Sequence, residues 1–206
     1  MTDERALPLR ERKRLRTRRA LAEAALRMFT ERGFDATTLD ELVDSVDVSK
    51  STFFRTFPCK EAAAIEAETE LWTSFVAALA GRELTGLATD GLRDALEEAA
   101  QGLEPGWDER YVATRRLIVS APSLMAYVEH YRAGVRVEAV EVLAGKLGLD
   151  ADDLRLPVLA ELTMTAWSTS GRVWVRAGGQ GGRKVLIDGM KRAFAAIPAA
   201  LSLSAG

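Results

Sequence analysis

Hydrophobic residues recur along most of this chain with the spacing of an amphipathic helix. Between residues 10 and 32, the side chains of Ala22, Ala25 and Phe29 share one face, and Gly33 is suited to end the helix. No segment shows the alternation typical of a strand, and the chain contains no internal repeat or heptad array. The pattern therefore predicts an all-α protein.

Two short helices are predicted next. The first spans Leu39 to Ser45 and follows Thr38, with Glu41 three residues later in the pattern of a capping box. The second lies within Val48 to Phe57 and ends before Pro58, which cannot continue a helix. Two short helices joined by a tight turn, the second with a basic outer face, describe a helix-turn-helix.

The second short helix has one face for packing and one for a polyanion. Phe53 and Phe57 are four residues apart and share a face, and Ser49 is a suitable N-cap. The opposite face carries Lys50, Ser51, Phe54 and Arg55. We interpret this helix as the DNA reader.

Three segments surround these helices in a fixed order. They are A-x-x-M-F-x-E-R-G-F from Ala25 to Phe34, ATTLDEL from Ala36 to Leu42, and VSKSTFFRTFPCKEA from Val48 to Ala62. In these segments the stretch from Leu21 to Glu61 resembles the TetR family of bacterial transcription regulators. The resemblance implies an N-terminal three-helix DNA-binding domain at residues 1–58 and a larger helical domain at residues 59–206 for effector binding and dimerisation.

The chain departs from the family pattern at three positions. Asp47 stands in the turn where such proteins usually have glycine, so we expect a left-handed residue that is not glycine. Phe54 replaces the usual tyrosine, which removes a phosphate hydrogen bond. Cys59 replaces the usual serine, which predicts a weaker cap for the next helix.

Charge is divided unevenly along the chain. Residues 1–60 hold 13 Lys and Arg against 10 Asp and Glu, whereas the whole chain has a net charge of −2. The basic excess is concentrated in Arg10, Arg12, Lys13, Arg14, Arg16, Arg18 and Arg19. Such a run is often only a solvated helix start, but beside a helix-turn-helix it favours contact with phosphates or the minor groove.

Nine residues are the candidate DNA contacts. We expect Lys50 and Ser51 to approach base edges, and Thr38 and Lys60 to hold phosphates. The full set is Thr37, Thr38, Ser49, Lys50, Ser51, Thr52, Phe54, Arg55 and Lys60.

The second domain is rich in large apolar and amphipathic side chains, which are typical of a ligand pocket, although each one alone is more often core. Arg115 and Arg116 are suited to an anionic head group. The candidate effector contacts are Trp72, Phe75, Trp107, Tyr111, Arg115, Arg116, Met125, Tyr127, Tyr131, Met164 and Trp167. The helix lengths are similar to those of TetR-family members associated with acyl-CoA or lipid-like effectors.

The family resemblance also implies a homodimer built on the last two long helices. The candidate contacts are Leu162, Ala166, Trp174, Leu186, Met190 and Phe194, for which the alternative is an intramolecular core. A single helix is expected from Lys60 to Ala80. It would link the reader to Trp72 and Phe75 of the pocket.

These observations predict a cytoplasmic homodimeric regulator, a repressor that a small apolar and anionic molecule releases from a palindromic operator in double-stranded DNA. The alternatives are an all-α enzyme or small-molecule-binding protein with a structural N-terminal hairpin, and a DNA-binding protein without an effector. Catalysis finds little support, since His130 is the only histidine and Cys59 the only cysteine. We expect no cofactor, no metal and no membrane span.

Overall fold

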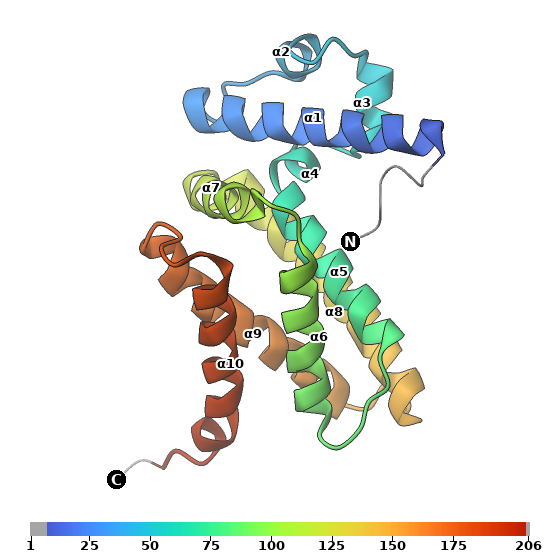
Figure 1. Ribbon diagram of the computed structural model, residues 1–206, viewed down its shortest axis with the longest axis vertical. Coiled ribbons are helices and arrows are strands. Elements are labelled where there is room, and N and C mark those ends of the chain that lie inside the picture. The colour runs from blue at the N-terminus through green and yellow to red at the C-terminus, as the bar shows by residue number, and fades with distance from the viewer. Residues whose placement is uncertain (1–7, 205–206) are drawn as a thin grey trace. The chain divides into compact units, whose positions relative to one another are not determined.

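The computed structural model describes residues 8–204, and this part of the chain contains ten helices and no strand (Figure 1). The all-α prediction is confirmed. No helix among these residues has the length and apolar content that crossing a bilayer requires. The helices are α1 Leu9–Arg32, α2 Leu39–Asp44, α3 Lys50–Thr56, α4 Lys60–Ala64, α5 Glu66–Gly81, α6 Ala88–Gly102, α7 Trp107–Ser120, α8 Pro122–Leu147, α9 Arg155–Arg176 and α10 Gly182–Leu201.

The chain divides into two compact units. The first comprises residues 1–69 and 113–129, and the second comprises residues 70–112 and 130–206. Helices α5, α7 and α8 each contribute residues to both units. The division of the chain by function at residues 58 and 59 stays a prediction.

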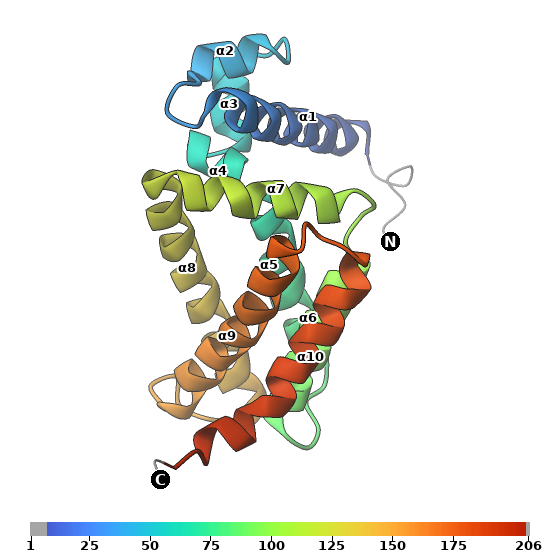
Figure 2. The same ribbon diagram turned by 90° about the vertical axis from the view of Figure 1, so that its left-hand side faces the viewer.

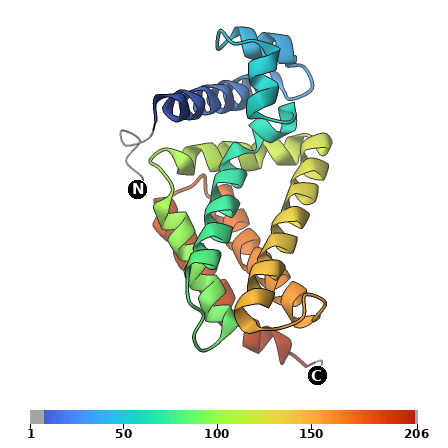
Figure 3. The same ribbon diagram turned by 90° about the vertical axis from the view of Figure 1, so that its right-hand side faces the viewer.

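In the first unit, α2 and α3 both pack against α1 and against each other (Figures 1 and 3). Their shared core contains Phe29 of α1, Leu42 of α2 and Phe53 of α3, each at most 1% exposed. Helix α4 also packs on α1. The short helices therefore gain their apolar burial from one long helix.

The helix expected from Lys60 to Ala80 is interrupted. It breaks at Ile65, whose φ of −103° and ψ of 18° depart from helical values, so α4 ends at Ala64 and α5 begins at Glu66. Ile65 is completely buried. The prediction of one continuous helix was wrong because a fixed turn, which periodicity does not reveal, separates two helical stretches.

In the second unit, α9 and α10 run side by side in opposite directions (Figure 2). Helix α6 packs on both of them. The turn between them contains Gly179, with φ 77°, where an added Cβ would lie 3.1 Å from Cγ2 of Val112. Residues 178–182 therefore form a tight turn in which Gly179 packs against Val112 and Trp174.

Two helix ends in this unit differ from what the nearest capping and helix-breaking residues would indicate. Neither Asp150 nor Asp152 caps α9, whose N-cap is Leu154. Instead, Asp153 accepts a hydrogen bond from the backbone N–H of Arg155 at 3.0 Å. Helix α10 continues through Pro198 to Leu201, because a proline close to a helix end removes only one backbone hydrogen bond.

Candidate nucleic-acid interface

Helix α2 begins with the capping box that the sequence predicts. The hydroxyl of Thr38 accepts a hydrogen bond from the Glu41 backbone N–H at 3.2 Å, and the Thr38 N–H donates to the Glu41 carboxylate at 2.9 Å. The Thr38 N–H and the Thr38 hydroxyl, which also donates to this carboxylate at 2.8 Å, hold the pKa of Glu41 below its ordinary value, with a smaller contribution from Arg32. Thr38 is therefore fixed at an exposed helix start, where a phosphate oxygen can approach.

The turn into α3 also follows local sequence signals. Asp47 has φ 53°, and among residues 8–204 it is the only residue other than glycine with positive φ. Ser49 caps α3 by accepting a hydrogen bond from the Thr52 N–H at 3.2 Å. Both predictions are confirmed, and together they fix the direction in which α3 starts.

The two faces of α3 differ as expected. Phe53 and Phe57 are buried, with ring centroids 5.8 Å apart. The exposed side chains are those of Lys50, Ser51, Phe54 and Arg55. A row of exposed polar and cationic groups on a short helix is the arrangement that reads a major groove.

Both exposed cations of α3 have intramolecular partners. The Nζ atom of Lys50 lies 2.5 Å from Oδ1 of Asp40, and Nη2 of Arg55 donates to the Thr52 hydroxyl at 3.0 Å. Both side chains of the Lys50 pair are more than half exposed, so solvent screens the interaction. A phosphate or a base edge can displace such partners at little cost.

The structure turns two of the nine candidate contacts inward. Thr37 is completely buried, and its hydroxyl donates to the Gly33 carbonyl at 2.9 Å. The ammonium of Lys60 donates to the carbonyls of Phe34 and Thr37 at 2.8 and 2.9 Å, and lies 4.2 Å from the Phe34 ring centroid. These carbonyls lie between α1 and α2 and require donors, so Lys60 presents no free charge for a phosphate.

Most of the candidate effector residues in the second unit form a packed aromatic cluster. The rings of Trp107 and Tyr111 stack with centroids 4.5 Å apart, and Nε1 of Trp167 donates to the Tyr111 hydroxyl at 2.9 Å. Trp72 contacts both Phe75 and Trp167 edge to face. Each of these five residues is at most 2% exposed, so the cluster is core in this state.

The other candidate effector residues are dispersed. Arg115 donates to the buried carboxylate of Glu68 at 2.8 Å, whereas Arg116 and Met125 are exposed. Tyr127 is half-buried and, with these three, belongs to the first unit. Tyr131 and Met164 belong to the second, where Arg136 donates to the Met164 sulfur at 3.8 Å. The sequence pattern grouped these side chains by composition, which does not determine their location.

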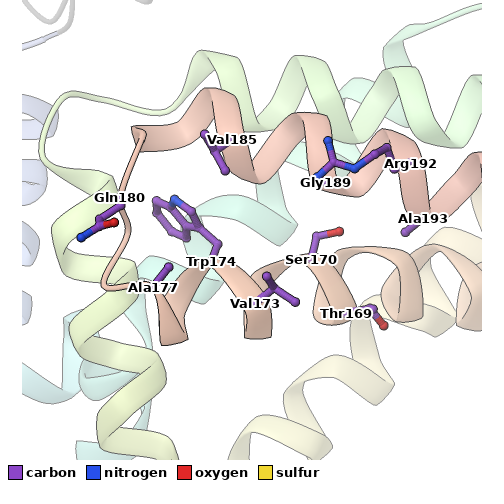
Figure 4. Close-up of a pocket in the computed structure, with 10 residues that line it drawn as sticks. All are labelled: Thr169, Ser170, Val173, Trp174, Ala177, Gln180, Val185, Gly189, Arg192 and Ala193. Atoms are coloured by element: carbon purple, nitrogen blue, oxygen red, sulfur yellow. The ribbon is translucent and has the colours of Figure 1, made fainter.

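A cavity of about 330 Å³ lies between α9 and α10 (Figure 4). Its walls are mostly apolar, and Arg192 and Gln180 supply polar groups. The lining residues are Thr169, Ser170, Val173, Trp174, Ala177, Gln180, Val185, Gly189, Arg192 and Ala193. Only Trp174 among them was a candidate for any site, because the others are small or isolated in the sequence.

The predicted dimer contacts lie mainly inside the chain's own core. Ala166, Trp174, Leu186, Met190 and Phe194 are buried, and Leu162 is half-buried. Burial within one chain favours the intramolecular alternative for these residues, and their role in a dimer stays a prediction. The exposed large apolar residues on the same two helices are Val158, Val173, Val185 and Leu201.

Known proteins share both parts of this arrangement. Residues 21–67 match the family model of bacterial regulatory proteins, tetR family, and residues 87–202 match that of the MftR C-terminal domain. The HTH-type transcriptional regulator TcmR of Streptomyces glaucescens is 32% identical over 152 residues, a match that covers 70% of this chain and 66% of TcmR. The chain thus matches slightly less than two thirds of that relative's length.

Solved structures have a similar fold. A transcriptional regulator from Rhodococcus sp. Rha1 has a TM-score of 0.52 at 17% identity, covering 89% of this chain and 96% of its own. A transcriptional regulator from Aquifex aeolicus VF5 has a TM-score of 0.51 at 13% identity, covering 88% and 99%. At these identities the similarity establishes the fold.

The placement of Lys60 leads to a test. We expect Lys60→Met to lower the free energy of unfolding by about 1–3 kcal/mol, because two carbonyls lose a charged donor. The salt dependence of DNA binding should change little. In the control, Lys50→Met, stability should change by less than about 1 kcal/mol, since that ion pair is exposed. Urea unfolding measures both, and unchanged stability of Lys60→Met would contradict the structural role.

Proposed function

We propose that this chain, which belongs to the TetR family of bacterial regulatory proteins, is a cytoplasmic repressor that binds a palindromic operator as a homodimer. Its family makes it a DNA-binding transcriptional regulator and not an enzyme. The operator proposal rests on the outer face of α3. This helix is capped at Ser49 and packed on α1, and it exposes Lys50, Ser51 and Arg55.

Base recognition is assigned to the start of α3. Lys50 and Ser51 lie in its first turn, the part of a recognition helix that enters the major groove. Phe54, which is 55% exposed, is suited to apolar contact with a thymine methyl group. Thr38, at the start of α2, is the proposed phosphate contact.

Helix α1 contributes a second basic surface. Arg10, Lys13, Arg14 and Arg16 are exposed in its first two turns. We assign these side chains to phosphates flanking the site, where they would add to affinity without reading sequence.

The homodimer is proposed to form on the outward faces of α9 and α10. Thr169 and Val173 of α9 and its C-cap Ala177 are spaced four residues apart, so they lie on one side of the helix. Val173 is 66% exposed and Val185 of α10 is 45% exposed. A second copy would cover this face and the cavity between the helices, and would set two recognition helices at the spacing of successive major grooves.

An effector is proposed to act at the aromatic cluster of the second unit. The cluster consists mainly of apolar ring surface and contains a hydrogen bond from Trp167 to Tyr111, so an apolar ligand such as an acyl-CoA or a fatty acid would enter by separating these rings. Helix α5 carries Trp72 and Phe75 and begins at Glu66 within the first unit, which connects the two parts covalently.

The DNA proposal is tested with a duplex that the wild-type protein selects from a random-sequence pool. Ser51→Ala should change the preferred base at one position of each half-site. The discrimination between bases at that position should change by about 1–3 kcal/mol. Lys50→Ala should also reduce the salt slope by about one unit. The control is Lys184→Ala, another exposed, ion-paired lysine, on α10. Failure of the wild type to select any sequence would contradict the proposal.

The dimer proposal is tested with Val173→Glu, which places a charge on the outward face of α9. Sedimentation velocity at micromolar concentration should show a monomer, and operator affinity should fall about 100-fold or more because the two half-sites are no longer linked. Val137→Glu is the matched control, since Val137 is 58% exposed on α8. A dimeric Val173→Glu protein would place the interface elsewhere.

The effector proposal is tested by tryptophan fluorescence, because all four tryptophans lie in the second unit and three of them belong to the cluster. Acyl-CoA thioesters and free fatty acids of graded chain length are the probes. A probe that changes the emission should weaken operator binding about 5- to 150-fold, and the operator should weaken the probe by the same factor. Emission changes without any effect on DNA affinity would exclude the coupling.

A further inference from the structure

One side chain of α1 holds the C-terminal end of the recognition helix. Nη1 of Arg18 donates to the carbonyl of Thr56, the last residue of α3, at 2.9 Å. The Arg18 guanidinium carbon lies 4.5 Å from the centroid of the Phe57 ring. Arg18 therefore contacts both the final carbonyl of α3 and the residue that ends it.

The same guanidinium is held from its other edge by Glu66. Nη2 of Arg18 donates to Oε2 of Glu66 at 2.7 Å, and Nε donates to Oε1. The Glu66 side chain is 10% exposed and the Arg18 side chain 32%, so water competes weakly for this pair. Two parallel bonds fix the plane of the guanidinium as well as its position.

The charges also agree with the helix ends that they meet. Arg18 places a cation at the C-terminus of α3, and Glu66 is the first residue of α5, directly after the break at Ile65. Both placements are favourable for the helix dipoles. Lysine cannot reproduce these contacts, because its ammonium is not a planar group with parallel donors and stacks poorly on an aromatic ring.

A recognition helix this short depends on its ends for direction. Seven residues span only about 10 Å, and the cap at Ser49 fixes the N-terminal end alone. Lys50 and Ser51 lie in the first turn and Arg55 in the last. A change in tilt therefore moves side chains at both ends relative to the base edges, while the charges stay near the phosphates.

We propose that Arg18 and Glu66 are positioning residues that set the angle of α3, and hence the discrimination between operator and other DNA. This rests on the proposed operator binding by α3. Arg18 is thereby removed from the phosphate contacts that the basic run suggested. Its effect on DNA is exerted through the Thr56 carbonyl and the Phe57 ring.

The test compares a duplex selected by the wild-type protein with a random-sequence duplex of equal length. Arg18→Lys keeps the charge but loses the two parallel hydrogen bonds to Glu66. Operator affinity should therefore fall about tenfold or more, the size of one lost base contact. Affinity for the random duplex should stay within about twofold, and the salt slope should be unchanged, since no phosphate contact is lost. A purely structural role would lower both affinities together.

Arg82→Lys is the matched control, because Arg82 in the second unit also donates to a carbonyl, that of Gly91, and to a carboxylate, that of Glu98. It should leave the ratio of the two affinities unchanged. Glu66→Gln keeps the shape of the partner and should reduce the ratio in the same direction. It also serves as the test if Arg18→Lys is unfolded at the assay temperature.

The double variant Arg18→Lys with Glu66→Gln should lose little more operator affinity than Arg18→Lys alone, because both residues act through the same ion pair. Ratios within twofold of wild type in both single variants, or equal losses on both duplexes, would overturn the proposal. If the wild-type protein selects no duplex, the failure lies instead in the proposed operator binding.

Discussion

The packing of α3 on α1 is the constraint on which the DNA module depends. A helix of seven residues does not persist alone in water, because the cost of nucleating it exceeds what its few hydrogen bonds return. Phe53 and Phe57 supply the missing stability by burying their rings. The caps, the turn at Asp47 and the contacts of Arg18 then determine how this anchored helix is oriented.

The basic residues of the first unit divide into two groups with different physical roles. Lys60 donates to backbone carbonyls of the loop between α1 and α2, Arg18 donates to the last carbonyl of α3, and both lie against aromatic rings. The cations exposed on α1 and α3 are the ones proposed to contact DNA. Net charge alone does not separate the groups, since an inward cation contributes to the charge of the segment but adds little to its electrostatic footprint.

Signals that depend on neighbours within four residues predicted the structure well. The capping box of Thr38 and the Ser49 cap are of this kind, whereas the left-handed Asp47 was expected from the family resemblance. The break at Ile65 was missed because apolar periodicity continues across it. Arg18 was assigned to phosphates, yet it precedes the buried Leu21 and Ala25 by three and seven residues, so its spacing already placed it on the inward face.

The last two helices show why helical spacing alone does not separate core residues from residues available to a partner. Trp174, Leu186 and Met190 are buried in the chain's own core. Val173 and Val185 are apolar as well, although they face outward. A surface helix normally keeps one apolar stripe, and a helix that is apolar on a second side is covered on that side too. The outward valines, which periodicity ranks below the core residues, are therefore the residues on which the proposed dimer would form.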